Sequence, residues 1–391
     1  MNRNRLILLA LATLLLAVVV AVLNRSGDAP VDGAGQPLLP GLAEVVNEID
    51  AIDVVAPGGE TIQLRRDQTR WRLPQRDDYE ADFARVLELL RNLHEAEIVA
   101  QKTSNPEWYA RLGVQDPGSP EATGRRIDFP GRELPSIIVG QTDPTDAGSY
   151  VRRADEAQSW QLDRVLEVPA DPVSWLERGV MDIPAEDIAE VVVRHPDGET
   201  IRLRRAGEEG TDFVLLDVPE GRSAGPAWRR TALGNGLRAL NLDDVRRFAP
   251  PIPDEATSLL FVTTDGLNFV VELFEDEDGH WAHFTVSAEP VPEAASEAET
   301  EGGNTVIETA AEALAAEAPA EIDERLAGEP AAASADEGEI GPVSDPNAER
   351  LASAVAVDAR LSPWLFKIPE RRYTDLTVRL ETLLEAVGED D

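Results

Sequence analysis

The sequence predicts an α+β protein: an N-terminal transmembrane helix followed by two similar α+β repeat units with antiparallel sheets, plus a disordered acidic insertion. Three observations lead to this prediction. An unbroken apolar run lies near the N-terminus, an eleven-residue motif occurs twice, and a segment rich in Ala, Glu and Pro precedes the C-terminal part. Strand-like alternation of apolar residues surrounds both copies of the motif, which is typical of antiparallel hairpins.

The apolar run extends from Leu6 to Leu23, and Thr13 is its only polar residue. At 1.5 Å per residue a helix of this run is roughly 27 Å long, close to the thickness of a bilayer's hydrocarbon core. Arg3 and Arg5 precede it, and basic residues tend to stay in the cytoplasm. We therefore expect residues 1–24 to form a cytoplasmic tip and transmembrane anchor.

This anchor predicts a single-pass protein of the bacterial inner membrane with a periplasmic C-terminal region. A cleaved signal peptide is the alternative, but its apolar region would be shorter and end at a small-x-small site. The nearest such site, Gly27–Ala29, lies late and precedes Pro30. Residues 25–43, which are rich in Gly, Pro and Asp, are expected to be a tether.

The repeated motif begins each of the two predicted units, at residues 44–183 and 184–288. Residues 56–66 read APGGETIQLRR and residues 195–205 read HPDGETIRLRR, with identity at eight of eleven positions. Each copy predicts a strand, a Gly-containing turn and a second strand. A third strand follows, at residues 71–73 and 213–216, and then a helix.

The helix of the first unit has a clear apolar stripe at 3.6-residue spacing, formed by Phe83, Val86, Leu87, Leu90 and Leu93. The counterpart around Leu233, Leu237 and Leu240 is weaker, because Gly234 and Gly236 lie within it. Strands are expected at 97–100, 126–129, 135–140, 149–153, 159–162 and 245–248, with a hairpin at 268–286.

The last part of the chain divides into two segments. Residues 289–346 are expected to be a disordered insertion, since from Glu289 to Ile340 there are fifteen acidic residues, one arginine and no aromatic residue. A transient helix is expected near 306–317. Residues 347–391 predict a strand and helix that complete the second unit.

Several stretches together resemble the DUF4340 family, a domain-of-unknown-function family of membrane-anchored bacterial envelope proteins. They are Leu39-Pro40-Gly41-Leu42, Ala81-Asp82-Phe83, residues 102–113, residues 149–153 and Trp175-Leu176. The resemblance covers most of residues 1–287 and the C-terminal 45 residues. Some members are encoded beside, or fused to, components resembling gliding-motility ABC transporters. The resemblance therefore implies an envelope protein associated with transport. The family has no established catalytic residues, so the resemblance assigns none to this chain.

The Gly221–Gly225 stretch matches the G-x-S-x-G nucleophile pattern, with Ser223 as the nucleophile of a serine hydrolase. Five-residue matches arise by chance in Gly-rich loops, and the equivalent loop of the first repeat has no serine. Pro219 and Pro226 on either side favour a relaxed loop. A structural loop is therefore the preferred interpretation.

Other residue types offer weaker chemistry. His280 and His283 are three residues apart on a strand, so they point to opposite faces and are unsuited to one metal ion. The acidic turn Glu275–Asp278 fails the EF-hand pattern. Seven tryptophans are able to stack on sugars, but core packing explains most of them. No catalytic, cofactor-binding or metal-binding residue is assigned, and no cofactor is expected.

Charge and cysteine content limit the partners. The chain has 36 basic and 74 acidic residues, a formal net charge of −38, and no cysteine. Nucleic acid is not expected, because such a surface repels phosphates. The sequence favours a non-enzymatic periplasmic interaction module, with a protein partner in an envelope or ABC transporter complex. The alternatives are a cell-envelope glycan-binding module and, less favoured, the Ser223 hydrolase.

Overall fold

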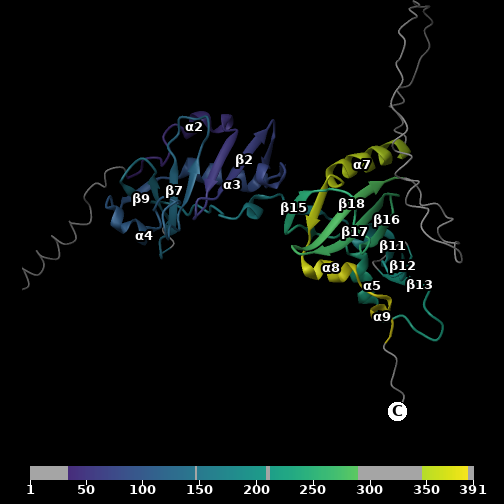
Figure 1. Cartoon of the computed structure of the whole chain (residues 1–391). Coiled ribbons are helices and arrows are strands. Elements are labelled where there is room, and N and C mark those ends of the chain that lie inside the picture. Colours follow the sequence, from purple (N-terminus) through teal and green to yellow (C-terminus); the bar gives the residue numbers. More distant parts are fainter. Residues whose placement is uncertain (1–33, 146–147, 208–211, 289–345, 386–391) are drawn as a thin grey trace, which may run out of the picture.

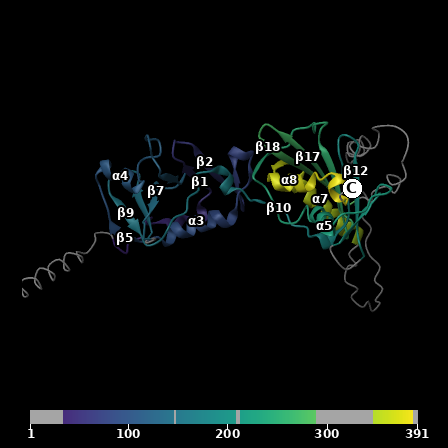
Figure 2. The ribbon, with the colours of Figure 1, turned by 90° about the horizontal axis from the view of Figure 1, so that it is seen from below.

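The computed structural model describes residues 34–145, 148–207, 212–288 and 346–385. It contains two sheet-bearing units side by side (Figures 1 and 2). The predicted α+β class with large antiparallel sheets is confirmed, since neighbouring strands run antiparallel in both sheets. The expected anchor Leu6–Leu23 and nearly all of the expected insertion lie outside the described residues. Within those residues, no helix is long and apolar enough to cross a membrane.

The first sheet has the strand order β4-β3-β2-β1-β6-β7-β8-β9-β5. Its strands are β1 (Ala51–Val55), β2 (Thr61–Asp67), β3 (Arg70–Leu73), β4 (Tyr79–Glu80), β5 (Ile98–Gln101), β6 (Arg125–Asp128), β7 (Ile137–Thr142), β8 (Ser149–Arg153) and β9 (Ser159–Leu162). Short helical segments connect them: η2 (Pro74–Arg76), η3 (Pro106–Trp108) and α4 (Tyr109–Leu112).

The predicted hairpin forms because alternate residues of both strands share one buried face. Val54 lies opposite Ile62, and Ile52 lies opposite Leu64, and all four side chains have no exposed surface. The turn between them contains Gly58, whose φ of 94° is a left-handed conformation that glycine adopts readily. The hairpin predicted from the repeated motif is thus confirmed in this unit.

Helix α3 (Phe83–Glu95) covers this buried face, but its buried stripe differs from the predicted one. Asp82 caps the helix by accepting a hydrogen bond from the amide of Arg85. Val86, Leu89, Leu90 and Leu93 are buried, whereas Phe83 and Leu87 are 55% and 52% exposed. The buried stripe of α3 therefore includes Leu89 in place of the predicted Phe83 and Leu87, because the core packs against the side of the helix that carries Leu89.

The expected tether is too long, since its last residues belong to the folded unit. Leu38, Leu39 and Leu42 are buried in the core, and helix α2 (Leu42–Val45) and η1 (Val46–Glu48) follow. The amide of Leu38 donates to the main-chain oxygen of Ala96 at 2.9 Å. This segment thereby covers the β5 edge of the first sheet, which would otherwise expose unpaired backbone groups.

The second sheet has the order β13-β12-β11-β16-β17-β18-β19-β15. Its strands are β11 (Ile188–Arg194), β12 (Thr200–Arg205), β13 (Phe213–Leu216), β15 (Asp244–Arg247), β16 (Thr257–Thr263), β17 (Asn268–Asp276), β18 (Gly279–Ser287) and β19 (Trp364–Lys367). The segment between the units contains η4 (Pro172–Trp175), β10 (Gly179–Met181), which pairs with β14 (Leu240–Asn241), and η5 (Ala185–Asp187).

The two sheets have the same arrangement when β4 is set aside. The order β3-β2-β1-β6-β7-β8-β9-β5 in the first corresponds, strand by strand, to β13-β12-β11-β16-β17-β18-β19-β15 in the second. The β8–β9 connection is formed by residues 154–158, whereas residues 288–363 connect β18 to β19. The expected insertion therefore lies at the position of a short turn in the first sheet.

Helices of the second unit pack against its sheet (Figure 1). They are α5 (Ala227–Gly234), α7 (Pro346–Leu361), α8 (Glu370–Leu376) and α9 (Leu380–Leu383). Helix α5 contacts β13, while α7 and α8 contact β18. Strand β19 lies between β18 and β15 and pairs with both, so the C-terminal residues are an integral part of this sheet.

The two units meet where η2 and β4 contact β15 and β19. The Tyr79 ring meets Trp364 edge-on, with 4.9 Å between the ring centroids. Arg76 makes a two-pronged ion pair with Asp244, at 2.6 and 3.2 Å. One hydrophobic cluster includes residues of both units, so the junction is a packed interface and not a bare linker.

Candidate functional site

The Gly221–Gly225 loop holds the C-terminal segment of the chain. The main-chain oxygen of Ser223 accepts a hydrogen bond from the amide of Glu385 at 2.9 Å. Arg222 next to it pairs with Glu381 at 2.8 Å. These contacts give the loop a structural function in holding the C-terminal segment.

The two histidines of β18 are separated, as expected for residues three apart on a strand. His283 donates from Nε2 to the main-chain oxygen of Ser362 at 2.9 Å, and the ring of His280 stacks on Tyr373 at 4.3 Å. Neither has a hydrogen bond to Ser223 within the described chain. The described residues also contain no group of three or more His, Cys, Asp or Glu side chains placed to hold a metal ion.

The acidic turn between β17 and β18 is satisfied by contacts within the protein. Asp276 binds Arg246 at 2.7 Å and accepts a hydrogen bond from the Trp281 indole at 2.8 Å. The Arg246 guanidinium also lies 3.9 Å from the centre of the Trp281 ring. A carboxylate engaged by a cation and an indole is a poor calcium ligand, because those contacts would have to break first.

Only two tryptophans of the described chain have half or more of their surface exposed. Trp108, in η3, is 50% exposed, and Trp228, at the start of α5, is 66% exposed. Each has a neighbouring guanidinium near its ring, Arg111 at 4.4 Å and Arg229 at 5.3 Å. Among the described tryptophans, only these two therefore have enough exposed surface to stack on a sugar in the glycan-binding alternative.

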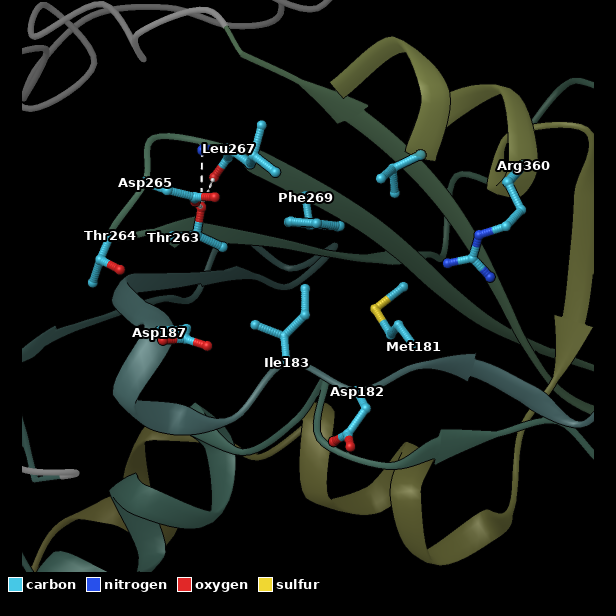
Figure 3. A pocket seen from close by; sticks show the side chains of 11 residues that line it. Met181, Asp182, Ile183, Asp187, Thr263, Thr264, Asp265, Leu267, Phe269 and Arg360 are labelled. Carbon is cyan, nitrogen blue, oxygen red and sulfur yellow. Dashed lines mark hydrogen bonds between the residues drawn. The ribbon is translucent and has the colours of Figure 1, made fainter. Parts of the chain in front are cut away.

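A cavity of about 440 Å³ lies in the second unit. Three segments far apart in sequence line it: the end of the inter-unit segment, the β16–β17 turn and the last turns of α7 (Figure 3). The lining residues are Met181, Asp182, Ile183, Asp187, Thr263, Thr264, Asp265, Leu267, Phe269, Val357 and Arg360. Its volume is in the range of ligand pockets.

Apolar side chains form much of this cavity. Phe269 comes from the start of β17 and Leu267 from the β16–β17 turn, and they are 3% and 7% exposed. Ile183 and Met181 come from the inter-unit segment, and Val357 from α7; all three are partly buried against the core. Such a surface favours an apolar group of a ligand or partner, since burial gives about 25 cal/mol per Å².

Three aspartates lie around the apolar part and are held in different ways. Asp182 accepts a hydrogen bond from the amide of Ala239 at 2.8 Å, and Asp265 accepts one from the hydroxyl of Thr263. The Asp187 main-chain oxygen accepts from the Thr264 amide at 2.8 Å, and its carboxylate has no ion-pair partner among the described residues. The rim of the cavity therefore carries three carboxylates, and hydrogen bonds hold the segments to which they belong.

Arg360 is the single cation of the lining. It reaches from α7 toward Met181, at the other end of the cavity from Thr264 and Asp265 (Figure 3). Its Nη1 donates to the main-chain oxygen of Val180 at 2.8 Å. This bond ties α7 to the inter-unit segment at that end of the cavity.

The cavity could not be found by sequence motifs. Its residues fall in three short stretches, and none of them matches a catalytic or metal-binding spacing. Asp265 follows two threonines in a turn and looks like an ordinary turn residue. Only the strand order, which brings the β16–β17 turn beside the end of α7, places these stretches together.

The sequence model of a family described as a domain of unknown function, DUF4340, matches residues 71–260. The chain resembles the DUF4340 family. The match begins at β3 and ends within β16, so it covers parts of both sheets and includes the inter-unit side of the cavity. No curated protein and no solved structure matches the chain significantly.

The family match confirms the resemblance predicted from the sequence over this range. The matched range leaves out residues 1–70 and the C-terminal part, over which the resemblance was also expected. The description of the family gives no activity. Function therefore has to be argued from the site itself.

Proposed function

We propose that this chain is a non-enzymatic, membrane-anchored periplasmic interaction module, an accessory subunit of an envelope complex such as an ABC-type transporter. The observation that carries the proposal is the open cavity with apolar walls and an acidic rim. We propose that this cavity receives a segment of a partner protein. The Thr263 hydroxyl, which donates to Asp265, also bonds the main chain of Leu267, so it serves as a turn contact, and this favours binding over catalysis.

The proposed location depends on the N-terminal sequence. The run from Leu6 to Leu23 is long enough to span a bilayer, and Arg3 and Arg5 favour a cytoplasmic N-terminus. One helix makes no transport path by itself, so an anchored protein of this kind acts through others.

The charge of the rim indicates the chemistry of the partner segment. Asp182, Asp187 and Asp265 face a single arginine, Arg360, around the cavity. A peptide that inserts an apolar side chain and carries a lysine or arginine beside it complements both features. The high net negative charge of the whole chain, −38, would also speed the approach of a basic segment.

Site-specific photocrosslinking of the full chain in its native membranes tests this proposal. A photoreactive amino acid replaces Ile183 in the cavity or, as the control, the exposed Asp155 in the β8–β9 turn of the first unit. We expect a crosslink to an envelope membrane protein from position 183 and not from position 155. Equal crosslinking from both positions, or none, contradicts the proposal.

A charge reversal makes the experiment more specific. Asp187→Lys in the crosslinking chain should lower the yield about tenfold, which corresponds to about 1.4 kcal/mol of binding free energy. Asp155→Lys makes the same charge change away from the cavity and should leave the yield unchanged. An unchanged yield with Asp187→Lys would show that the rim does not select the partner.

Glycan binding is the second candidate, favoured by the two exposed indoles. Trp108 and Trp228 each present more surface than the other five tryptophans of the chain, which are buried or partly buried. If the chain binds purified cell-envelope glycan, Trp228→Ala or Trp108→Ala should reduce its retention. Retention that neither substitution changes would remove this candidate.

We also infer that the two units are repeats derived from a duplication. The shared motif and the equal order of eight strands in the two sheets support this inference. The first unit has no equivalent of this cavity, because α7 and the extended β18–β19 connection have no counterpart there. A duplicated scaffold with one specialised copy fits a module that binds one partner.

A further inference from the structure

The described helices α5, α7 and α8 pack against one face of the second sheet. Helix α5 lies against Phe213, α7 lines the cavity together with Phe269, and Leu376 of α8 lies beside Gly236 with Phe261. The strand register places the three phenylalanines on the same face, because they occupy matching alternate positions of paired strands. We call the opposite face of this sheet the outer face.

The middle of the outer face is apolar. Val192 of β11 lies opposite Leu260 of β16, and Leu260 lies opposite Val270 of β17. Val262 lies on the same face, two residues after Leu260. Val192 is 7% exposed, and the other three side chains are partly exposed. We call these four residues the outer patch.

The cover on the outer face stops short of the outer patch. Residues of the 248–256 segment pack on Phe274, Trp281 and Leu365, which lie toward the other end of the strands. The equivalent connection of the first unit, residues 102–124, is longer and contains η3 and α4. The second sheet therefore has the smaller covering segment on its outer face.

The first sheet has charged residues where the second has the outer patch. Asp53 and Asp128 lie opposite each other, and each carboxylate forms an ion pair with an arginine, at 2.6 and 3.0 Å. The repeated motif aligns Asp53 with Val192, and the strand pairing then aligns Asp128 with Leu260. The apolar character is thus not a requirement of this sheet architecture, and exposed apolar patches mark interaction surfaces.

Two opposite charges flank the outer patch. Arg194 and Glu272 lie on either side of Ser258 in one row across the strands. Arg194 is exposed, and neither residue has an ion-pair partner among the described residues. Burial raises the pKa of Glu272, and the Ser258 hydrogen bond and the charge of Arg194 oppose this only in part. A cation that contacted Glu272 would stabilise its charged form.

A two-fold axis parallel to β16 makes the outer face complementary to itself. With Leu260 on the axis, the rotation exchanges the β11 side with the β17 side. Val192 then faces Val270 of the second copy, and Leu260 faces its own equivalent. The same rotation brings Arg194 opposite Glu272 of the second copy. One operation therefore matches both the apolar and the charged residues, as an isologous interface requires.

The size of the outer face is sufficient for such a contact. The five strands from β12 to β18 form a face of roughly 24 by 24 Å, from a strand spacing of about 4.8 Å and a rise of about 3.4 Å per residue over the length of β11 or β16. Two such faces bury roughly 1,100 Å², slightly more than the roughly 1,000 Å² expected of a specific interface.

We propose that two copies of this chain associate through the outer patch, with Leu260 at the two-fold axis. The occupant is a second copy, because this face matches itself in both apolar residues and charge. The contact is independent of the function proposed above. It leaves the cavity free, since Thr263 and Phe269 point to the other face of the sheet, so a dimer carries two cavities.

The absence of cysteine in the natural sequence permits a direct test by thiol crosslinking. Leu260→Cys in the detergent-solubilised full chain is treated with a short bismaleimide, because facing sheets are about 10 Å apart, too far for a direct disulfide. The matched control is Asp128→Cys, at the equivalent place of the first sheet. We expect at least about tenfold more covalent homodimer from Leu260→Cys, owing to the high effective concentration of facing thiols.

Equal or negligible homodimer yields from these two variants overturn the proposal. Crosslinking of position 260 in native membranes to a different protein, in place of a second copy, also overturns it. Because Leu260 is partly exposed, its replacement should leave the fold intact, and an unchanged circular dichroism spectrum checks this.

A charge exchange tests the orientation of the two copies. Arg194→Glu or Glu272→Arg alone places like charges opposite each other and should weaken the dimer about tenfold, measured as its dissociation constant by analytical ultracentrifugation. The combined variant restores opposite charges and should recover the affinity of the natural chain. A combined variant that is as weak as the single variants, or single variants that dimerise as the natural chain does, contradicts the proposed axis.

Discussion

His283 illustrates how burial sets the chemistry of a single residue. The side chain lies between β18 and the segment after β15, where its ring stacks on Phe248 with 3.8 Å between the ring centroids. Burial lowers its pKa below the ordinary value, and the hydrogen bond to Ser362 and the charge of Asp358 oppose this only in part. The ring is therefore kept neutral and serves as a structural hydrogen-bond donor.

The lowered pKa predicts a stability that depends on pH. The unfolded chain binds a proton at His283 more readily than the folded chain does, so the free energy of unfolding should fall as pH decreases below roughly 6.5, the ordinary pKa of histidine. His283→Gln keeps an amide donor for Ser362 and removes the titration. Denaturant unfolding at several pH values should give a flatter profile for this variant than for the natural chain. An unchanged slope would show that His283 does not cause it.

At the scale of elements, the second helix differs from the predicted one: α5 ends at Gly234, so Leu237 follows the helix and Leu240 lies in β14. Gly234 and Gly236 interrupt the predicted stripe, and glycine costs about 1 kcal/mol in a helix relative to alanine. In the structure a Cβ atom at Gly234 would lie 2.2 Å from the Phe213 ring, and one at Gly236 would lie 2.4 Å from Leu376. The glycines are needed because the aromatic and aliphatic side chains of neighbouring elements occupy that space.

Gly234→Ala should therefore destabilise the second unit, in spite of the higher helix propensity of alanine. We expect a loss of about 1–3 kcal/mol in the free energy of unfolding, the usual effect of overpacking a core. Gly207→Ala is not a suitable control because φ at Gly207 is 82°. Gly118→Ala is suitable, since nothing lies within 4 Å of its Cβ position, and it should change stability little. A stabilised Gly234→Ala variant would contradict this account.

Local patterns predicted most strands, because the alternation of residues such as Ile62 and Leu64 acts within a few residues. They failed where distant segments decide burial. Leu87 follows the helical spacing as well as Leu89 does, and only the position of the core makes Leu89 the buried one. Leu38 seemed part of a tether because its partner Ala96 is far away in the sequence.

At the scale of the whole molecule, the junction between the units has the features of a folded interface. Tyr79 is 8% exposed and contacts Trp364 and Phe366 across it. Burial raises the pKa of the Tyr79 hydroxyl above its ordinary value. The cavity is lined by the inter-unit segment together with two distant stretches of the second unit. For this reason no single stretch of sequence predicted the cavity.

Removing the Tyr79 ring should separate the unfolding of the two units. Tyr79→Ala is expected to lower the free energy of unfolding by about 3–5 kcal/mol, as for other buried aromatic residues, and to broaden or split the thermal transition. Tyr109→Ala removes an equally exposed ring, also 8%, from the first unit alone, and should destabilise that unit without splitting. Calorimetry that shows one sharp transition for Tyr79→Ala would indicate that the units unfold together for another reason.

The position of β19 has a consequence for how the second sheet is assembled. This strand is made after residues 289–345, yet it is the neighbour of both β18 and β15. Until residues 364–367 are in place, β15 has no strand neighbour in this sheet, because β19 joins it to β18 at one edge of the strand order. An engineered protease site anywhere in 289–345 would consequently yield two fragments that stay together through backbone hydrogen bonds until a denaturant parts them.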